Sequence, residues 1–115
     1  MSDIYTEAVE RLSRVQGVRG ALLVDAEAGL PVTAELVDGV SGTAVAALAA
    51  SLFRRTATAT SSATFGQLAT VQLEADEGHV IAVSAGEFII VVIAMRDAQL
   101  GLVRLECHRA AESLT

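Results

Sequence analysis

The sequence is poor in the residue types that build most catalytic and ligand-binding sites. Its 115 residues include one cysteine, one proline, no tryptophan and no lysine, and aromatic residues make up 3%. Without lysine, a Schiff-base mechanism and a phosphate-loop lysine are excluded. A single cysteine excludes an intramolecular disulfide and fits a reducing compartment, so we expect a cytoplasmic protein. So few aromatic side chains also argue against a large, aromatic-lined ligand pocket.

The charge balance is acidic, because fourteen acidic residues face eight arginines and the net charge is −6. An acidic chain binds nucleic acid and anionic membranes poorly. The first dozen residues are charged and amphipathic, unlike a signal peptide. The longest apolar run, residues 88–95, is too short to span a bilayer. We therefore expect neither a nucleic-acid partner nor membrane insertion.

Valine, isoleucine, leucine and alanine supply most of the 52% hydrophobic content, and 115 residues suit one domain over residues 1–115. The periodicity predicts a helix over residues 3–16 and two strands in "VRGALLVDAEAGLPVTAEL". Pro31 predicts that the second strand lies at a sheet edge or begins at this residue, because proline lacks the N–H of a central strand. A helix follows, then a three-stranded meander in residues 65–95 and a helix over residues 100–114.

Two of these strands, around residues 21–24 and 88–95, are apolar on both faces. Each must therefore be covered on both sides. Helices then lie on both faces of one mostly antiparallel sheet, which is an α+β fold.

Motifs for chemistry are mostly absent. No G-x-G spacing or phosphate-binding loop occurs, so no nucleotide cofactor is expected. Cys107 and His108 point about 100° apart on a helix, which argues against a metal site. A hydrolase would pair His79 with a serine such as Ser84, yet no nucleophile-elbow sequence is present. The pair Asp76 and Glu77 has the pattern of a solvated hairpin tip, so we expect no catalytic residue.

The middle helix, "AVAALAASLFRRTATATSSAT" (residues 44–64), has two charges only, Arg54 and Arg55. The helical spacing predicts a core stripe made of Val45, Leu48, Ala49, Leu52, Phe53 and Thr56. The opposite face then holds Ala46, Ala47, Ala50, Ser51, Arg54, Arg55, Ala57 and Thr58. A wide uncharged face of small residues favours contact with a partner, and a second copy is the simplest one. The alternative is an exposed alanine-rich helix from an arginine- and alanine-rich proteome.

The order of these segments resembles the roadblock-type dynein light chain domains, bacterial and archaeal kinds included. The similarity rests on "GVRGALLVDAEAGLPV", "AVAALAASLF", "GQLATVQLEADEGHVIAVSAGEFIIVVIA" and "LGLVRLECHRAA". It implies a five-stranded antiparallel sheet with one helix on one face and two on the other. It also implies a homodimer formed through the middle helix and the strand over residues 67–75. The interface residues would be Ala46, Ala47, Ala50, Ser51, Arg54, Thr58, Leu68, Thr70 and Gln72.

The resemblance further implies a non-enzymatic binding module. Bacterial members of this family often partner small Ras-like GTPases, some as activators of GTP hydrolysis, while others are scaffold subunits. Arg54 and Arg55 would lie on the partner-binding surface, either as an arginine finger or as salt-bridge and dimer contacts. Two alternatives stay open: a scaffold without a GTPase partner, and a small enzyme or ligand sensor on a profilin-like sheet.

Overall fold

The computed structural model describes residues 3–115; Met1 and Ser2, with which the predicted domain begins, lie outside the described residues. The helices are α1 (Ile4–Ser13), α2 (Gly42–Ser62) and α3 (Leu100–Leu114). The strands are β1 (Val18–Asp25), β2 (Pro31–Leu36), β3 (Thr70–Ala75), β4 (Gly78–Ala85) and β5 (Phe88–Ala94). This is the predicted order of helices and strands.

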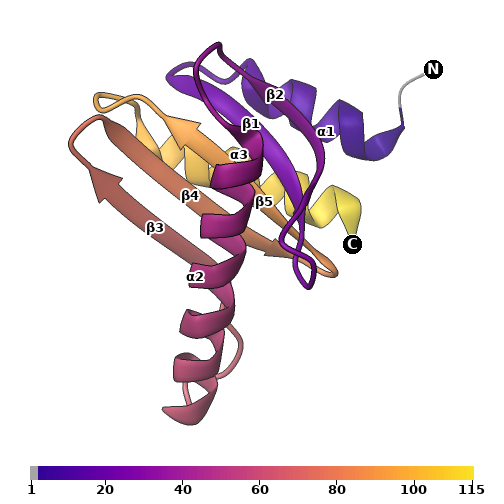
Figure 1. Ribbon diagram of the computed structural model, residues 1–115, viewed down its shortest axis with the longest axis vertical. Coiled ribbons are helices and arrows are strands. Elements are labelled where there is room, and N and C mark those ends of the chain that lie inside the picture. The colour runs from indigo at the N-terminus through magenta and orange to yellow at the C-terminus, as the bar shows by residue number, and fades with distance from the viewer. Residues whose placement is uncertain (1–2) are drawn as a thin grey trace.

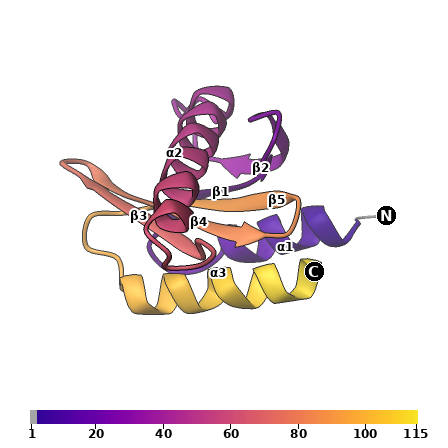
Figure 2. The same ribbon diagram turned by 90° about the horizontal axis from the view of Figure 1, so that it is seen from below.

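The five strands form one antiparallel sheet in the order β2-β1-β5-β4-β3. Helix α2 lies on one face of the sheet, and α1 and α3 lie on the other (Figures 1 and 2). The predicted α+β fold is therefore confirmed. Pro31 begins β2 at one edge of the sheet, as its missing N–H predicts.

The centre of the sheet separates two hydrophobic cores. Side chains of β1 alternate, so Leu22 and Val24 pack toward α2, while Ala21 and Leu23 pack toward α1 and α3. Strand β5 does the same with Val91 on one face and the neighbouring residues on the other. Both strands are covered on both sides, as their continuous apolar sequences predict.

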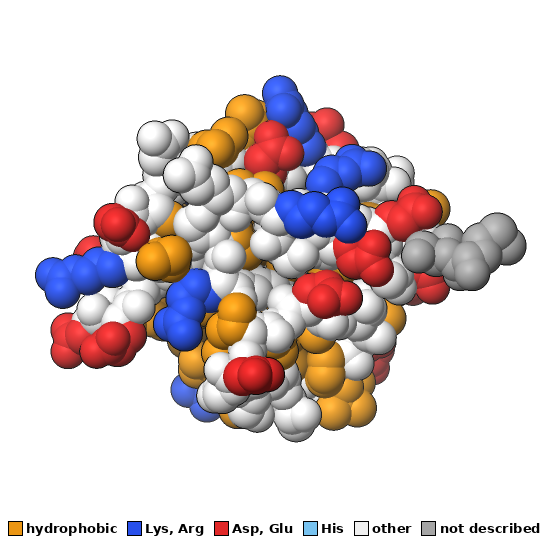
Figure 3. Space-filling model, turned by 90° about the horizontal axis from the view of Figure 1, so that it is seen from above, with side chains coloured by type: hydrophobic (Ala, Val, Ile, Leu, Met, Phe, Trp, Pro, Cys, Tyr) orange, Lys and Arg blue, Asp and Glu red, His pale blue; other side chains and the backbone are white. Residues whose placement is uncertain are grey.

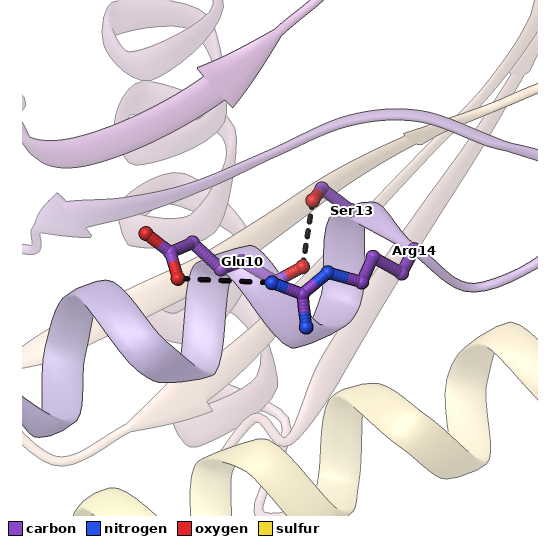
Figure 4. Close-up of polar contacts among 3 residues, drawn as sticks. All are labelled: Glu10, Ser13 and Arg14. Carbon is purple, nitrogen blue, oxygen red and sulfur yellow. Dashed lines mark hydrogen bonds and ion pairs between the residues drawn. The ribbon is translucent and has the colours of Figure 1, made fainter.

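Local contacts define where the helices begin. Asp3 accepts a hydrogen bond from the Thr6 amide at 2.7 Å, and Ser41 accepts one from the Ala44 amide at 3.2 Å. These side chains satisfy amides that have no partner within the helix. Figure 4 shows the exposed end of α1, where Arg14 approaches Glu10 at 3.9 Å and the Ser13 hydroxyl donates to the Glu10 carbonyl at 2.7 Å.

The rotation of α2 differs from the prediction. Its buried side chains are Ala46, Ala49, Ala50 and Phe53. Leu48, expected in the core, is 50% exposed, whereas Ala46 and Ala50, expected at the dimer surface, are fully buried in their own chain. The expectation for these three residues was wrong.

The reason is the close approach of α2 to the rest of the domain. A Cβ placed on Gly29, which has φ +70°, would lie 3.4 Å from the Ala50 Cβ. A leucine at position 50 would overfill that space, because protein cores are close-packed. Alanines therefore make up most of the inward side of α2, together with Phe53, while Leu48 lies on a side of the helix that is half-exposed.

The C-terminal part of α2 extends past the edge of the sheet (Figure 1). Residues 61–67 are exposed, so neither the last turn of the helix nor the segment that follows it is covered by the domain. Strand β3 then begins at Thr70, three residues later than predicted.

Candidate functional site

An apolar groove runs between α2 and the β3–β4 part of the sheet, and we call it the α2–β3 groove. It is lined by Leu48, Ala49, Leu52, Val71, Leu73, Val80 and Ala82. None of these side chains carries a charge. The enclosed part of the groove has a volume of about 10 Å³, which is room for about one water molecule. The groove is therefore too shallow to enclose a small-molecule ligand. Its chemistry suits the side chains of another protein.

The groove exists because α2 does not cover the whole sheet. The helix contacts β1, β2 and β5, which leaves its face of β3 and β4 partly open. This groove was not predicted from the sequence, because Leu48 and Leu52 were expected to lie in the core. Their spacing of four residues signals one shared side of the helix, and only the rotation of the helix decides that this side is exposed.

Strand β3 is also an edge strand. Within the described sheet it pairs with β4 alone, so its outer backbone groups lie next to the α2–β3 groove. Unpaired edges are templates for pairing with another strand. On the opposite face, α3 holds this edge in place: Arg104 donates to the side-chain Oε1 of Gln72 at 2.8 Å, and His108 is hydrogen-bonded to the Thr70 hydroxyl at 3.2 Å.

Most of this surface is built by a segment that contains no acidic residue. From Gly39 to Leu73 there is no aspartate or glutamate, although the chain has fourteen of them. Two copies that each carry a net charge of −6 repel one another, so they approach most easily through a face without carboxylates. The opposite end of the molecule is different, because it shows arginine and acidic side chains side by side (Figure 3).

The two arginines of α2 have separate environments. Arg54 Nη1 donates to the carbonyl oxygens of Ala26 and Glu27, both at 3.2 Å, and so ties the helix to the β1–β2 turn. That turn is itself ordered by Asp25, whose Oδ1 accepts from the Glu27 and Ala28 amides. Arg55 is exposed and makes no hydrogen bond or ion pair within residues 3–115. Arg55 is therefore the arginine available to a partner.

Comparisons with known proteins agree with this architecture. Residues 4–94 match the family model described as Roadblock/LC7 domain. Over 103 residues the chain is 30% identical to Uncharacterized protein MJ1340 of Methanocaldococcus jannaschii, with 90% of each protein covered. The chain belongs to the Roadblock/LC7 domain family.

Solved structures show the same fold for this roadblock domain. A Roadblock/LC7 domain from Streptomyces avermitilis superposes with a TM-score of 0.85 at 24% identity, covering 94% of this chain and 92% of that chain. Myxococcus xanthus MglB superposes with a TM-score of 0.87 at 21% identity, covering 96% and 91%. At these identities the likeness concerns the fold.

The other interface residues predicted for the roadblock domain are divided between two environments. Ala47 and Thr58 are exposed on α2, and Ser51 is half-buried there. Leu68 is partly buried and packs against the core beneath α2. These residues lie around the α2–β3 groove and its strand edge, and their contact with a second copy stays a prediction.

The residues weighed for catalysis do not converge. His79 is buried, with its Nε2 at 3.3 Å from the Arg96 carbonyl oxygen, while Ser84 is exposed five residues along the same strand. Because strand side chains alternate, these two residues point to opposite faces of the sheet. His79 Nδ1 has no hydrogen-bond partner within the described residues. The geometry gives no nucleophile–base pair between them.

Cys107 and His108 also diverge, as expected. Cys107 is fully buried in the core beneath α3, and burial raises the pKa of its thiol to about 12, with a further contribution from the nearby Glu106 carboxylate. His108 is exposed and contacts Thr70. Asp76 and Glu77 are exposed at the β3–β4 turn. Within residues 3–115, no three His, Cys, Asp or Glu residues gather as a metal site would require.

A larger hollow of about 330 Å³ lies between α1 and α3, on the face away from α2. Its charged lining comes from Glu7, Arg11, Glu106 and Arg109, and the last two form an ion pair at 3.0 Å. Ligand sites are usually lined by hydrophobic and aromatic groups, so this hollow fits a small-molecule sensor poorly. No helix within the described residues has both the length and the apolar character needed to cross a membrane.

Proposed function

We propose that this roadblock domain is a non-enzymatic, homodimeric binding module that regulates or recruits a small Ras-like GTPase. The observation that carries the proposal is the apolar, uncharged lining of the α2–β3 groove beside the unpaired edge of β3. An edge strand and an adjoining apolar groove together provide backbone pairing and side-chain burial for a second copy. The GTPase partner is what the family resemblance implies.

A two-fold axis through the β3 edges would join the two sheets antiparallel and bring the two α2 helices onto one side. Such an interface is isologous, because each copy contributes the same residues. We expect it to bury at least about 1,200–2,000 Å² in total, the usual range for a stable dimer. The exposed Arg55 side chains would then lie on the α2 side of the dimer, where a GTPase could reach them.

The dimer is tested by sedimentation equilibrium over a wide range of protein concentrations. A single monomeric species at all concentrations would contradict the proposal. Partner binding is tested by pull-down with the small Ras-like GTPases of the same organism, each loaded with GDP or a non-hydrolysable GTP analogue. Preferential recovery of one nucleotide form supports regulation, whereas equal recovery with unchanged hydrolysis favours the scaffold alternative.

The two arginines provide a matched pair of variants. Arg55→Ala should reduce binding or hydrolysis without changing the fold, because Arg55 is exposed and makes no hydrogen bond or ion pair within residues 3–115. Arg54→Ala removes the contacts to the β1–β2 turn and serves as the structural control. Loss of hydrolysis with intact binding in Arg55→Ala would support an arginine finger, and loss of both would support docking alone.

A further inference from the structure

Phe65 is the most exposed large hydrophobic side chain among the described residues, at 83%. It lies three residues after the end of α2, whose C-terminal part extends past the sheet (Figure 1). A solvent-exposed phenylalanine is unfavourable, because its apolar surface stays in contact with water. The sequence has no tryptophan, and its other aromatic side chains, Tyr5, Phe53 and Phe88, are buried or half-buried in the domain.

The backbone around Phe65 is well defined. The Phe65 amide donates to the Thr60 carbonyl at 3.0 Å, and the Thr64 amide donates to the Ser61 carbonyl at 3.1 Å. These two hydrogen bonds form a Schellman motif at the end of the helix. In that motif the residue at the position of Phe65 usually packs against the helix residue five positions earlier, which here is the polar Thr60.

The motif also places Thr64 in a strained conformation. Thr64 has φ +62° and is the one non-glycine residue with positive φ among the described residues. This region is unfavourable for a β-branched side chain, and such outliers cluster at functional positions. The helix end thus holds Phe65 away from its own domain at a conformational cost.

We infer that Phe65 of one copy packs across the apolar surface of the α2–β3 groove of the other copy and is the aromatic anchor of the dimer. This inference rests on the homodimer of the proposed function. The groove is apolar and uncharged, and it borders the β3 edge about which the two copies would be related. The occupant is a second copy because neither the groove lining nor residues 39–73, which contain Phe65, carry a carboxylate, on a chain of net charge −6.

Two-fold symmetry makes this contact reciprocal. In a dimer with antiparallel α2 helices, we expect the free end of one helix to reach the β3–β4 face of the other copy, where the groove lies. Each copy then provides one anchor and one groove, so two identical contacts form per dimer. Aromatic side chains in well-packed pockets near the centre of an interface commonly dominate binding.

The position of Phe65 is tested with the photoreactive analogue p-benzoylphenylalanine at residue 65, in a mixture of ¹⁵N-labelled and unlabelled protein. We expect cross-links between a labelled and an unlabelled copy that map by mass spectrometry to Leu48, Leu52 or residues 71–82. The same analogue at Leu30, which is 57% exposed in the β1–β2 turn, is the control and should give no such cross-link. Cross-links confined to one copy, or mapping elsewhere on the partner, would overturn the inference.

The energetic test is Phe65→Ala. We expect its dimer dissociation constant to rise at least tenfold in sedimentation equilibrium, with an unchanged circular dichroism spectrum because the side chain contacts little of its own domain. Phe65→Leu should recover part of the affinity. A Phe65→Ala dimer as tight as the wild type would overturn the anchor while leaving the homodimer intact, whereas a monomeric wild type would remove both.

Discussion

Replacing Leu48 with alanine separates a contact within one chain from a contact between two chains. Leu48 is 50% exposed, so about half of its side chain already packs against its own domain. Complete burial of a leucine contributes about 1.5–3 kcal/mol relative to full exposure. The exposed half therefore offers a partner roughly 0.7–1.5 kcal/mol.

In a two-fold dimer the substitution removes this contribution from both copies. The loss is then roughly 1.5–3 kcal/mol per dimer. Because 1.4 kcal/mol corresponds to a tenfold change, the dimer dissociation constant should rise by about 10- to 150-fold. The free energy of unfolding of the monomer should fall only modestly, by about the half that is already buried.

The assay is sedimentation equilibrium of the wild type and the variant at matched concentrations. Leu30→Ala is a matched control, because Leu30 is 57% exposed but lies at the β1–β2 turn, away from the α2–β3 groove. We expect the control to change the dissociation constant less than twofold. An unchanged constant for Leu48→Ala, or an equal change for Leu30→Ala, would refute the assignment of the groove to the dimer.

Two further substitutions and two measurements on Cys107 probe the domain itself. Ala50→Glu should lower the free energy of unfolding by more than about 3 kcal/mol in urea titration, because it buries an unpaired charge at a fully buried position; a small effect would mean that Ala50 lies on the surface. Gly78→Ala should lower the melting temperature, since its Cβ would lie 2.4 Å from the Ala94 carbonyl oxygen at φ +153°; an unchanged melting temperature would contradict that close approach. Cys107 should react with thiol reagents at pH 8 only as fast as the domain opens, because burial raises its pKa to about 12. The raised pKa also means that this thiol's contribution to stability is complete below about pH 9 and decreases as pH rises toward 12, which unfolding at several pH values measures.

The sheet and two of the helices could be predicted because their sequences have a strong period. Strands β1 and β5 are apolar at consecutive positions, which only a doubly covered strand tolerates. Helix α3 buries Val103, Cys107 and Ala110, which are spaced four and three residues apart and so share one side of the predicted helix. For each of these elements, only one orientation buries all of its apolar residues.

Helix α2 has no such constraint, and this is why its rotation could not be predicted. Alanine, serine and threonine occupy most of its surface, so several rotations bury a similar apolar area. The prediction assigned the largest side chains of this helix to the core, and it therefore placed Leu48 inside. The short distance between α2 and the turn at Gly29 leaves room only for a small side chain at position 50, so Ala50 faces inward. That distance is a property of the tertiary structure.

The same reasoning gives the exposed leucines a meaning that the sequence alone did not. If α2 only needed to cover its own sheet, a polar residue at position 48 would improve solubility at no cost to the core, because the core is already filled by Ala46, Ala49, Ala50 and Phe53. A half-exposed leucine beside an unpaired strand edge, in a segment without carboxylates, is instead what an interface between two copies requires. The small residues set the distance between helix and sheet within one chain, and the larger ones provide the apolar surface for the other chain.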